Sequence, residues 1–209
     1  MKPYGDEVLL KLDRSIRLAK RAQEDEILEL NALTEEEIFD GVRHGNLTLH
    51  GTLIRFTPQQ FWGDGFLLPL PDVLVQVPRG KLQQDHNRQG HEEAMWTDEI
   101  HGITFGLTRL NHPLEASQVE VIGHAMTEQM RIRKKDAQWL HEETVHGDPL
   151  VMFYSESIQP SVRGIAYDIF FVTSVDGRLV TGNVRFPMEQ LQIWRPITRA
   201  IFMCAQVTA

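Results

Sequence analysis

The chain has 209 residues, of which 42% are hydrophobic and 24% are charged, and its formal net charge is −8. These values suit one globular domain with a buried core and exclude a disordered chain. The acidic balance argues against nucleic acid as the main partner, because phosphate contacts need clustered basic residues, and the one basic run, residues 131–135, suits the C-terminal end of a helix.

The first 45 residues are predicted to form a helical arm. In residues 6–43, apolar side chains recur at helical spacing and charged residues occupy most other positions. Thr34 followed by Glu37 matches a capping box, so a short second helix is expected to begin there and to end near Gly41. Such an arm packs on its own domain, on a second copy of the chain, or on another protein.

Strands and loops are expected after the arm. Residues 47–56 alternate in polarity around Gly51, which is typical of a bent or bulged strand. Residues 56–65 are expected to form a loop that carries Phe61 and Trp62.

The next segment contains prolines and then a polar stretch. In residues 66–78, Pro69 and Pro71 indicate an edge or irregular segment. The firmer strand is expected to hold Val73, Val75 and Val77. Residues 79–93 are polar, contain glycine and asparagine, and are predicted to form a mobile loop.

A strand and a central helix are predicted in the middle of the chain. Residues 103–110 have the composition of a strand. Ser117, with Glu120 three residues later, suits the start of the helix. Its buried face is predicted to hold Val121, Ala125, Met126 and Met130.

Two hairpins and a helix are predicted at the C-terminal end. Residues 138–157 are expected to turn at residues 147–149, and residues 167–187 at the pair Asp176–Gly177, which suits a type I′ turn. Pro187 suits the first turn of a helix. That helix has an apolar stripe of Met188, Leu191, Trp194, Ile197, Ile201 and Phe202, and the single cysteine, Cys204, is interpreted as a small buried hydrophobe.

The order of these elements predicts an α+β fold over residues 46–209, in which helices cover an antiparallel sheet. Residues 65–207 resemble the Mog1/PsbP-like fold, which DUF1795 proteins share. The resemblance is in the order of the elements: "VLVQVP", "ITFGLTRL", a helix, two long hairpins and "MEQLQIWRPITRAIF". The resemblance implies a binding scaffold without enzymatic activity. Relatives with this fold bind small GTPases, belong to photosystem complexes, or act as chaperones for bacterial secretion effectors.

Sequence motifs for catalysis give little support to an enzyme. The chain has neither a Gly-x-Ser-x-Gly elbow nor a glycine-rich phosphate loop. His141 and His146 are five residues apart on a predicted strand, so they lie on opposite faces and do not form a zinc-protease pair. The polar loop offers His86, His91 and Glu92 as metal ligands, although such loops are often only solvated, and we expect no other cofactor.

Aromatic residues in or beside the predicted loops are the candidates for partner binding, namely Phe61, Trp62 and Trp96. Alternatively, these rings cover the core from the loop side. We therefore predict a non-enzymatic protein-binding or chaperone-like module, with homo-oligomer formation through residues 6–43 as a further option. Two alternatives remain. One is a metal-assisted hydrolase that uses the His86–His91 loop, and the other is a carrier of a small apolar ligand.

No window of eighteen apolar residues and no signal-peptide pattern occurs in the sequence. A chain without a membrane span, located in the cytoplasm, is therefore expected.

Overall fold

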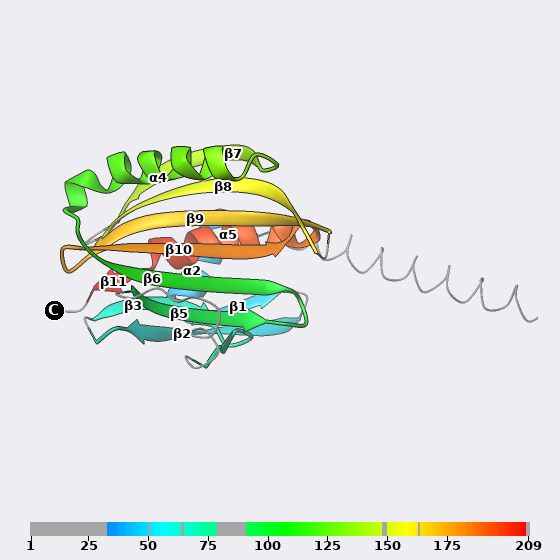
Figure 1. Ribbon diagram of the computed structural model, residues 1–209. Helices are drawn as coiled ribbons and strands as arrows, with labels where there is room; N and C mark the ends of the chain where they lie inside the picture. The colour runs from blue at the N-terminus through cyan, green and yellow to red at the C-terminus, as the bar shows by residue number, and fades with distance from the viewer. Residues whose placement is uncertain are drawn as a thin grey trace, which may run out of the picture.

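The computed structural model describes most of the chain after the first 32 residues, in the ranges 33–49, 51–63, 65–78, 91–147, 150–162 and 164–207. At residues 91 and 92 only the backbone is described. Within these ranges, eleven strands form two antiparallel sheets, and three α-helices pack on them (Figure 1). The α+β fold predicted from the sequence is therefore confirmed, whereas the part of the predicted arm before residue 33 lies outside the described residues.

A seven-stranded sheet forms the centre of the fold. Its strands are, in spatial order, β4 (Val75–Gln76), β5 (His91–Asp98), β6 (Ile103–Pro113), β10 (Arg178–Pro187), β9 (Gly164–Val175), β8 (Val151–Ser161) and β7 (Gln138–His146). Both predicted hairpins are present as β7–β8 and β9–β10. Asp176 and Gly177 have φ values of 50° and 66°, which are the positive values that a type I′ turn requires.

A smaller sheet pairs β1 (Asn46–Leu49), β2 (Thr52–Phe61), β3 (Phe66–Pro71) and β11 (Gln206–Val207). The prediction of one bent strand over residues 47–56 was wrong, because Gly51 has a φ of 70° in a turn that separates β1 from β2. The predicted loop from residue 56 was also wrong, since β2 continues to Phe61.

The proline-rich β3 is the best-buried strand of this sheet, contrary to the sequence prediction of an irregular segment. Phe66, Leu68 and Leu70 are buried in the core. Pro58 of β2 lies directly opposite Pro69 of β3, so the two missing backbone donors fall at the same position of the ladder. The valines that were expected to form the firmer strand contribute only the two-residue β4.

Two helices cover the two faces of the seven-stranded sheet (Figure 1). On one face, α4 (Val119–Arg133) follows a 3₁₀ turn, η1 (Ala116–Gln118), and packs over β8 and β9. On the other face, α5 (Leu191–Met203) follows η2 (Met188–Gln190) and packs between the two sheets.

The predicted buried face of α4 was wrong for Val121 and Ala125, which are exposed, whereas Met126 packs against the core as predicted. The fully buried residues of α4 are Val119, Gly123 and Thr127. A Cβ atom added at Gly123 would overlap the ring of Phe153, so the helix approaches the sheet through small side chains. Ser117 lies in η1 and does not cap α4.

The short helix α2 (Glu35–Arg43) begins where the sequence predicts. Thr34 donates its backbone N–H to Glu37 Oε2 at 2.8 Å, and Thr34 Oγ1 accepts the backbone N–H of Glu37 at 3.2 Å, which confirms the capping box. The helix extends past Gly41 and packs against α5, with Ile38 and Val42 in the core. This last part of the predicted arm therefore packs on the domain, and the division at residue 45 stays a prediction.

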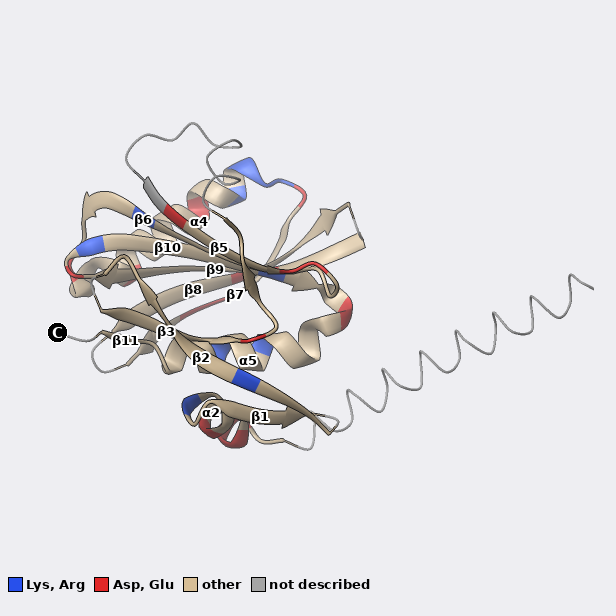
Figure 2. Ribbon diagram, turned by 90° about the horizontal axis from the view of Figure 1, so that it is seen from below, with Lys and Arg blue, Asp and Glu red and all other residues tan. Residues whose placement is uncertain are grey.

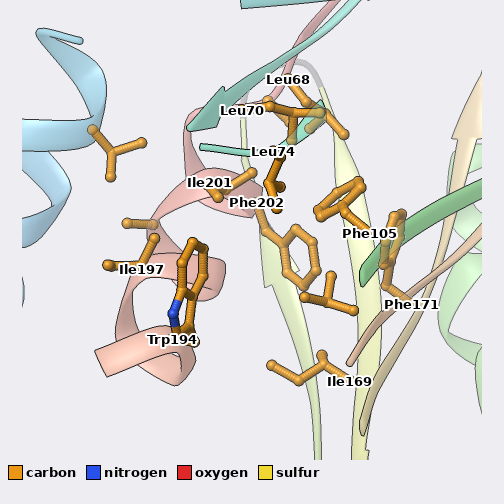
Figure 3. Packing of buried hydrophobic residues seen from close by; sticks show 14 of the residues in the cluster. Leu68, Leu70, Leu74, Phe105, Ile169, Phe171, Trp194, Ile197, Ile201 and Phe202 are labelled. Carbon is orange, nitrogen blue, oxygen red and sulfur yellow. The ribbon is translucent and has the colours of Figure 1, made fainter. Parts of the chain in front are cut away.

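The core lies between α5 and the two sheets. Trp194, Ile197, Ile201 and Phe202 are buried on α5, which confirms the apolar stripe. Ile201 and Phe202 lie toward labelled side chains of the two sheets (Figure 3). The labelled partners in the sheets include Leu68, Leu70, Phe105, Ile169 and Phe171. Most of the core is thus complete only when α5 is in place.

Candidate functional site

A cavity of about 530 Å³ opens between α2, α5 and the end of the seven-stranded sheet, and we call it the α2–α5 cavity. Its apolar lining is Leu33, Ile38, Leu140, Leu191 and Pro196. Its polar lining is Glu35, His141, Glu156, Tyr167, Gln192, Arg195 and Arg199. Figure 2 shows the basic segments of α5 beside α2, which carries acidic residues. A cavity that combines apolar walls with converging polar groups is the usual form of a ligand site.

A buried carboxylate forms one wall of the cavity. Glu156 of β8 is 1% exposed. It accepts hydrogen bonds from Arg195 Nε at 3.0 and 3.1 Å, from Arg195 Nη2 at 3.0 Å and from the Tyr167 hydroxyl at 2.6 Å. The charge of Glu156 is therefore compensated, as a buried carboxylate requires.

A second carboxylate repeats this arrangement at the edge of the sheet. Glu143 of β7 accepts hydrogen bonds from the Tyr154 hydroxyl, from Arg199 Nη2 at 3.0 Å and from His141 Nε2 at 3.2 Å. His141 and Glu143 are two residues apart and lie on one face of β7. Each arginine of α5 is thus held in place by a carboxylate of the sheet.

The environment of these groups fixes their charges near neutral pH. Burial is the main cause that raises the pKa of Tyr154, and the hydrogen bond to Glu143 raises it further. Burial and the hydrogen bond to Glu156 raise the pKa of Tyr167 in the same order. The hydrogen bond from Tyr154 lowers the pKa of Glu143. Burial opposes the charge of Arg195, but Glu156 outweighs it and raises the arginine pKa. Groups with such pKa values suit binding better than proton transfer at neutral pH.

The two buried tyrosines predict a loss of stability in alkali. Above about pH 10, tyrosine ionises in the unfolded chain, while Tyr154 and Tyr167 stay protonated in the folded chain. The folded state then binds more protons, so stability falls by up to about 1.4 kcal/mol per pH unit for each tyrosine. Urea unfolding between about pH 8 and about pH 11 measures this slope, and Tyr167→Phe should reduce it. An unchanged slope in this variant would contradict the assignment.

The predicted aromatic site residues lie together at the end of β2. The rings of Phe61 and Trp96 are 5.0 Å apart and only 3% and 5% exposed. Trp62 is half-buried, stacks on Phe66, and has the Arg109 guanidinium 5.4 Å from its ring centroid. Burial of Phe61 and Trp96 favours the alternative in which the rings cover the core. Partner binding at this cluster stays a prediction, and it concerns Trp62 above all.

The predicted metal site falls largely outside the described residues. His86 is not among them, and His91 and Glu92 are described only as backbone at the start of β5. Elsewhere in the described chain, no group of three or more His, Cys, Asp or Glu side chains is placed to hold a metal ion. A metal site at His86, His91 and Glu92 therefore stays a prediction.

Known proteins resemble this chain in fold. No protein-family model and no curated protein sequence matches it. The solution structure of cyanobacterial PsbP (CyanoP) from Synechocystis sp. PCC 6803 is similar with a TM-score of 0.52 and 12% identity, over 73% of this chain and 92% of that chain. LpqN, involved in cell envelope biogenesis of Mycobacterium tuberculosis, has a TM-score of 0.46 and 12% identity, over 75% of this chain and 92% of that chain.

The similarity to CyanoP shows that the fold is PsbP-like, which confirms the fold resemblance predicted from the order of elements. Within the described ranges, each helix is too short or too polar to cross a membrane.

Proposed function

We propose that this chain is a non-enzymatic, cytoplasmic protein-binding module that receives a segment of a partner protein in the α2–α5 cavity. The observation that carries the proposal is the pair of arginines on α5. Glu156 and Glu143 hold Arg195 and Arg199 in place, and both arginines line the cavity. Pre-organised guanidinium groups bind carboxylates strongly, because little side-chain freedom remains to be lost.

Apolar side chains beside the arginines define the rest of the partner segment. Leu140 lines the cavity although 44% of its surface is exposed, and Leu33 and Leu191 lie in the same lining. Burying such side chains against a partner contributes roughly 25 cal/mol per Å² of apolar area. The partner segment is therefore both acidic and apolar. In a chaperone-like form of this function, it is an amphipathic helix of a client protein.

A second copy of the chain is the other candidate partner. Leu33, the first described residue, lines the cavity. The segment "EDEILEL" at residues 24–30 is itself acidic and apolar. Residues 6–43 of one copy would then contribute to a homo-oligomer, which a mass measurement in solution distinguishes from binding of a different protein.

Leu140→Glu tests the proposal. The added carboxylate repels an acidic segment and removes apolar contact, so recovery of the partner with tagged full-length chain should fall about tenfold. Because Leu140 is already largely exposed, stability should change by less than about 1 kcal/mol. Leu53→Glu is the matched control, since Leu53 is 49% exposed on β2 and is not part of the described lining.

Quantitative mass spectrometry of partners isolated from the cells of origin measures the effect. Equal recovery with Leu140→Glu, Leu53→Glu and the unmodified chain would exclude this cavity as the binding site.

A further inference from the structure

A second cavity of about 530 Å³ lies on the other side of α2, and we call it the α2–β3 cavity. It is bounded by α2, by β2 and β3 of the small sheet, and by the C-terminal end of α5. Its volume falls in the range of small-molecule sites. A small apolar-ligand carrier was one of the alternatives from the sequence. Beneath α4 such a ligand finds no room at Gly123, which is in direct contact with Phe153.

The floor of the α2–β3 cavity offers apolar surface without backbone donors. Pro58 and Pro69 lie opposite each other in the β2–β3 ladder, and both line the cavity with Leu67. Neither proline has an N–H group, so their rings add carbon atoms to the floor and no backbone donor. A polar group placed on the two prolines would find no backbone donor there, whereas an alkyl chain needs none.

The wall from α5 is apolar and adaptable. Met203 lines the cavity although it is 51% exposed, and its flexible thioether adjusts to the shape of a ligand. Cys204 beside it is half-buried, and burial raises the pKa of its thiol to about 11 despite the nearby charge of Arg43. At neutral pH the thiol is uncharged and adds to the apolar wall.

One cationic group lies among the lining residues. Arg43 ends α2, and within the described chain it forms no ion pair. Asp40, on the same helix, is the acidic group that also influences Cys204. His44 donates a hydrogen bond from Nδ1 to the Asp40 carbonyl oxygen at 2.8 Å, which fixes its ring. Among the described residues, nothing therefore competes with an anion for Arg43 at this cavity.

We infer that the α2–β3 cavity binds an amphiphile with one carboxylate and an unbranched apolar tail. The tail lies on Pro58, Pro69 and Leu67, against the sulfur atoms of Met203 and Cys204, and the carboxylate pairs with Arg43. This ligand would be bound independently of the partner segment in the α2–α5 cavity, because the two cavities share none of their lining residues.

Decanoate, below its micelle concentration, tests this inference on the full chain. Calorimetry should show saturable binding, and decanoate should slow the reaction of Cys204, the only cysteine, with a neutral thiol reagent in proportion to occupancy. Arg43→Gln should weaken decanoate binding about tenfold, because a charge-assisted hydrogen bond usually contributes about that much to affinity. Arg55→Gln, at an exposed arginine of β2, is the matched control and should bind like the unmodified chain.

Two further measurements distinguish a specific site from nonspecific adsorption of an alkyl chain to the protein surface. Met203→Trp should fill the cavity and abolish binding while the unfolding temperature is retained. Decylamine, with the opposite charge, should give no protection of Cys204. The inference would be overturned if decanoate showed no saturable binding. It would also be overturned if Arg43→Gln bound decanoate, and the unmodified chain bound decylamine, as tightly as the unmodified chain binds decanoate. Leu140→Glu should still bind decanoate, so failure of the protein-binding proposal would leave this result unchanged.

Discussion

Replacing Arg195 by methionine is expected to lower the free energy of unfolding by about 3–5 kcal/mol at neutral pH. Glu156 is buried, and three of its four hydrogen bonds come from Arg195. Without the guanidinium, the carboxylate keeps only the hydroxyl of Tyr167 and remains an uncompensated charge inside the protein. Urea denaturation of the variant and the unmodified chain measures the difference.

Two control variants show whether the buried charge is the cause. Adding Glu156→Leu to Arg195→Met should restore most of the stability, because a buried ion pair and an apolar pair of similar volume are often equivalent. Arg131→Met removes a guanidinium that pairs with Glu128 and Glu142 on the surface, and it should cost about 1 kcal/mol or less. If Arg195→Met and Arg131→Met lowered the free energy of unfolding by similar amounts, burial of Glu156 would not be the cause of the loss.

Gly182→Ala is expected to destabilise the fold by about 3 kcal/mol, at the upper end of the usual cost of overpacking. Gly182 lies in β10 between β6 and β9, and an added Cβ atom would overlap the buried ring of Phe171. It would also lie 2.9 Å from the carbonyl oxygen of Gly106. The ring cannot move far, because it packs between Phe105 and Phe202.

Gly106→Ala in the neighbouring strand β6 is a close control. The nearest atom to a Cβ at Gly106 would be the Asn183 carbonyl oxygen at 3.9 Å, which is ordinary contact, so stability should change by less than about 0.5 kcal/mol. Combining Gly182→Ala with Phe171→Leu should cost less than the sum of the two single changes, by about 1–2 kcal/mol. Additive costs would contradict a clash with this ring.

Local patterns in the sequence predict much of the fold. The β9–β10 hairpin, the capping box of α2 and the apolar stripe of α5 each depend on residues that are close in the chain. Prediction fails where distant residues decide the outcome. Pro69 is acceptable in β3 because β11 pairs only with Phe66 and Leu67, and Gly123 marks the buried side of α4 because Phe153 lies beneath it.

The α2–α5 cavity was missed for the same reason. Glu156 and Arg195 are 39 residues apart, and neither belongs to a motif. One signal was present in the sequence: Glu156 shares a strand face with Met152 and Tyr154, so an acidic residue stands among inward-facing apolar positions. A buried acid of this kind requires a cation, and the two arginines four residues apart on α5 are suitable.

The position of α5 and β11 has a consequence for synthesis on the ribosome. Gln206 and Val207 pair with Phe66 and Leu67, and α5 fills the space between the sheets. A nascent chain therefore exposes the apolar side chains of β3 until α5 and β11 have left the exit tunnel, because these contacts cannot form earlier. Until then, aggregation is countered only by whatever shields the growing chain, and the emergence of α5 and β11 is the step that allows the interior to close.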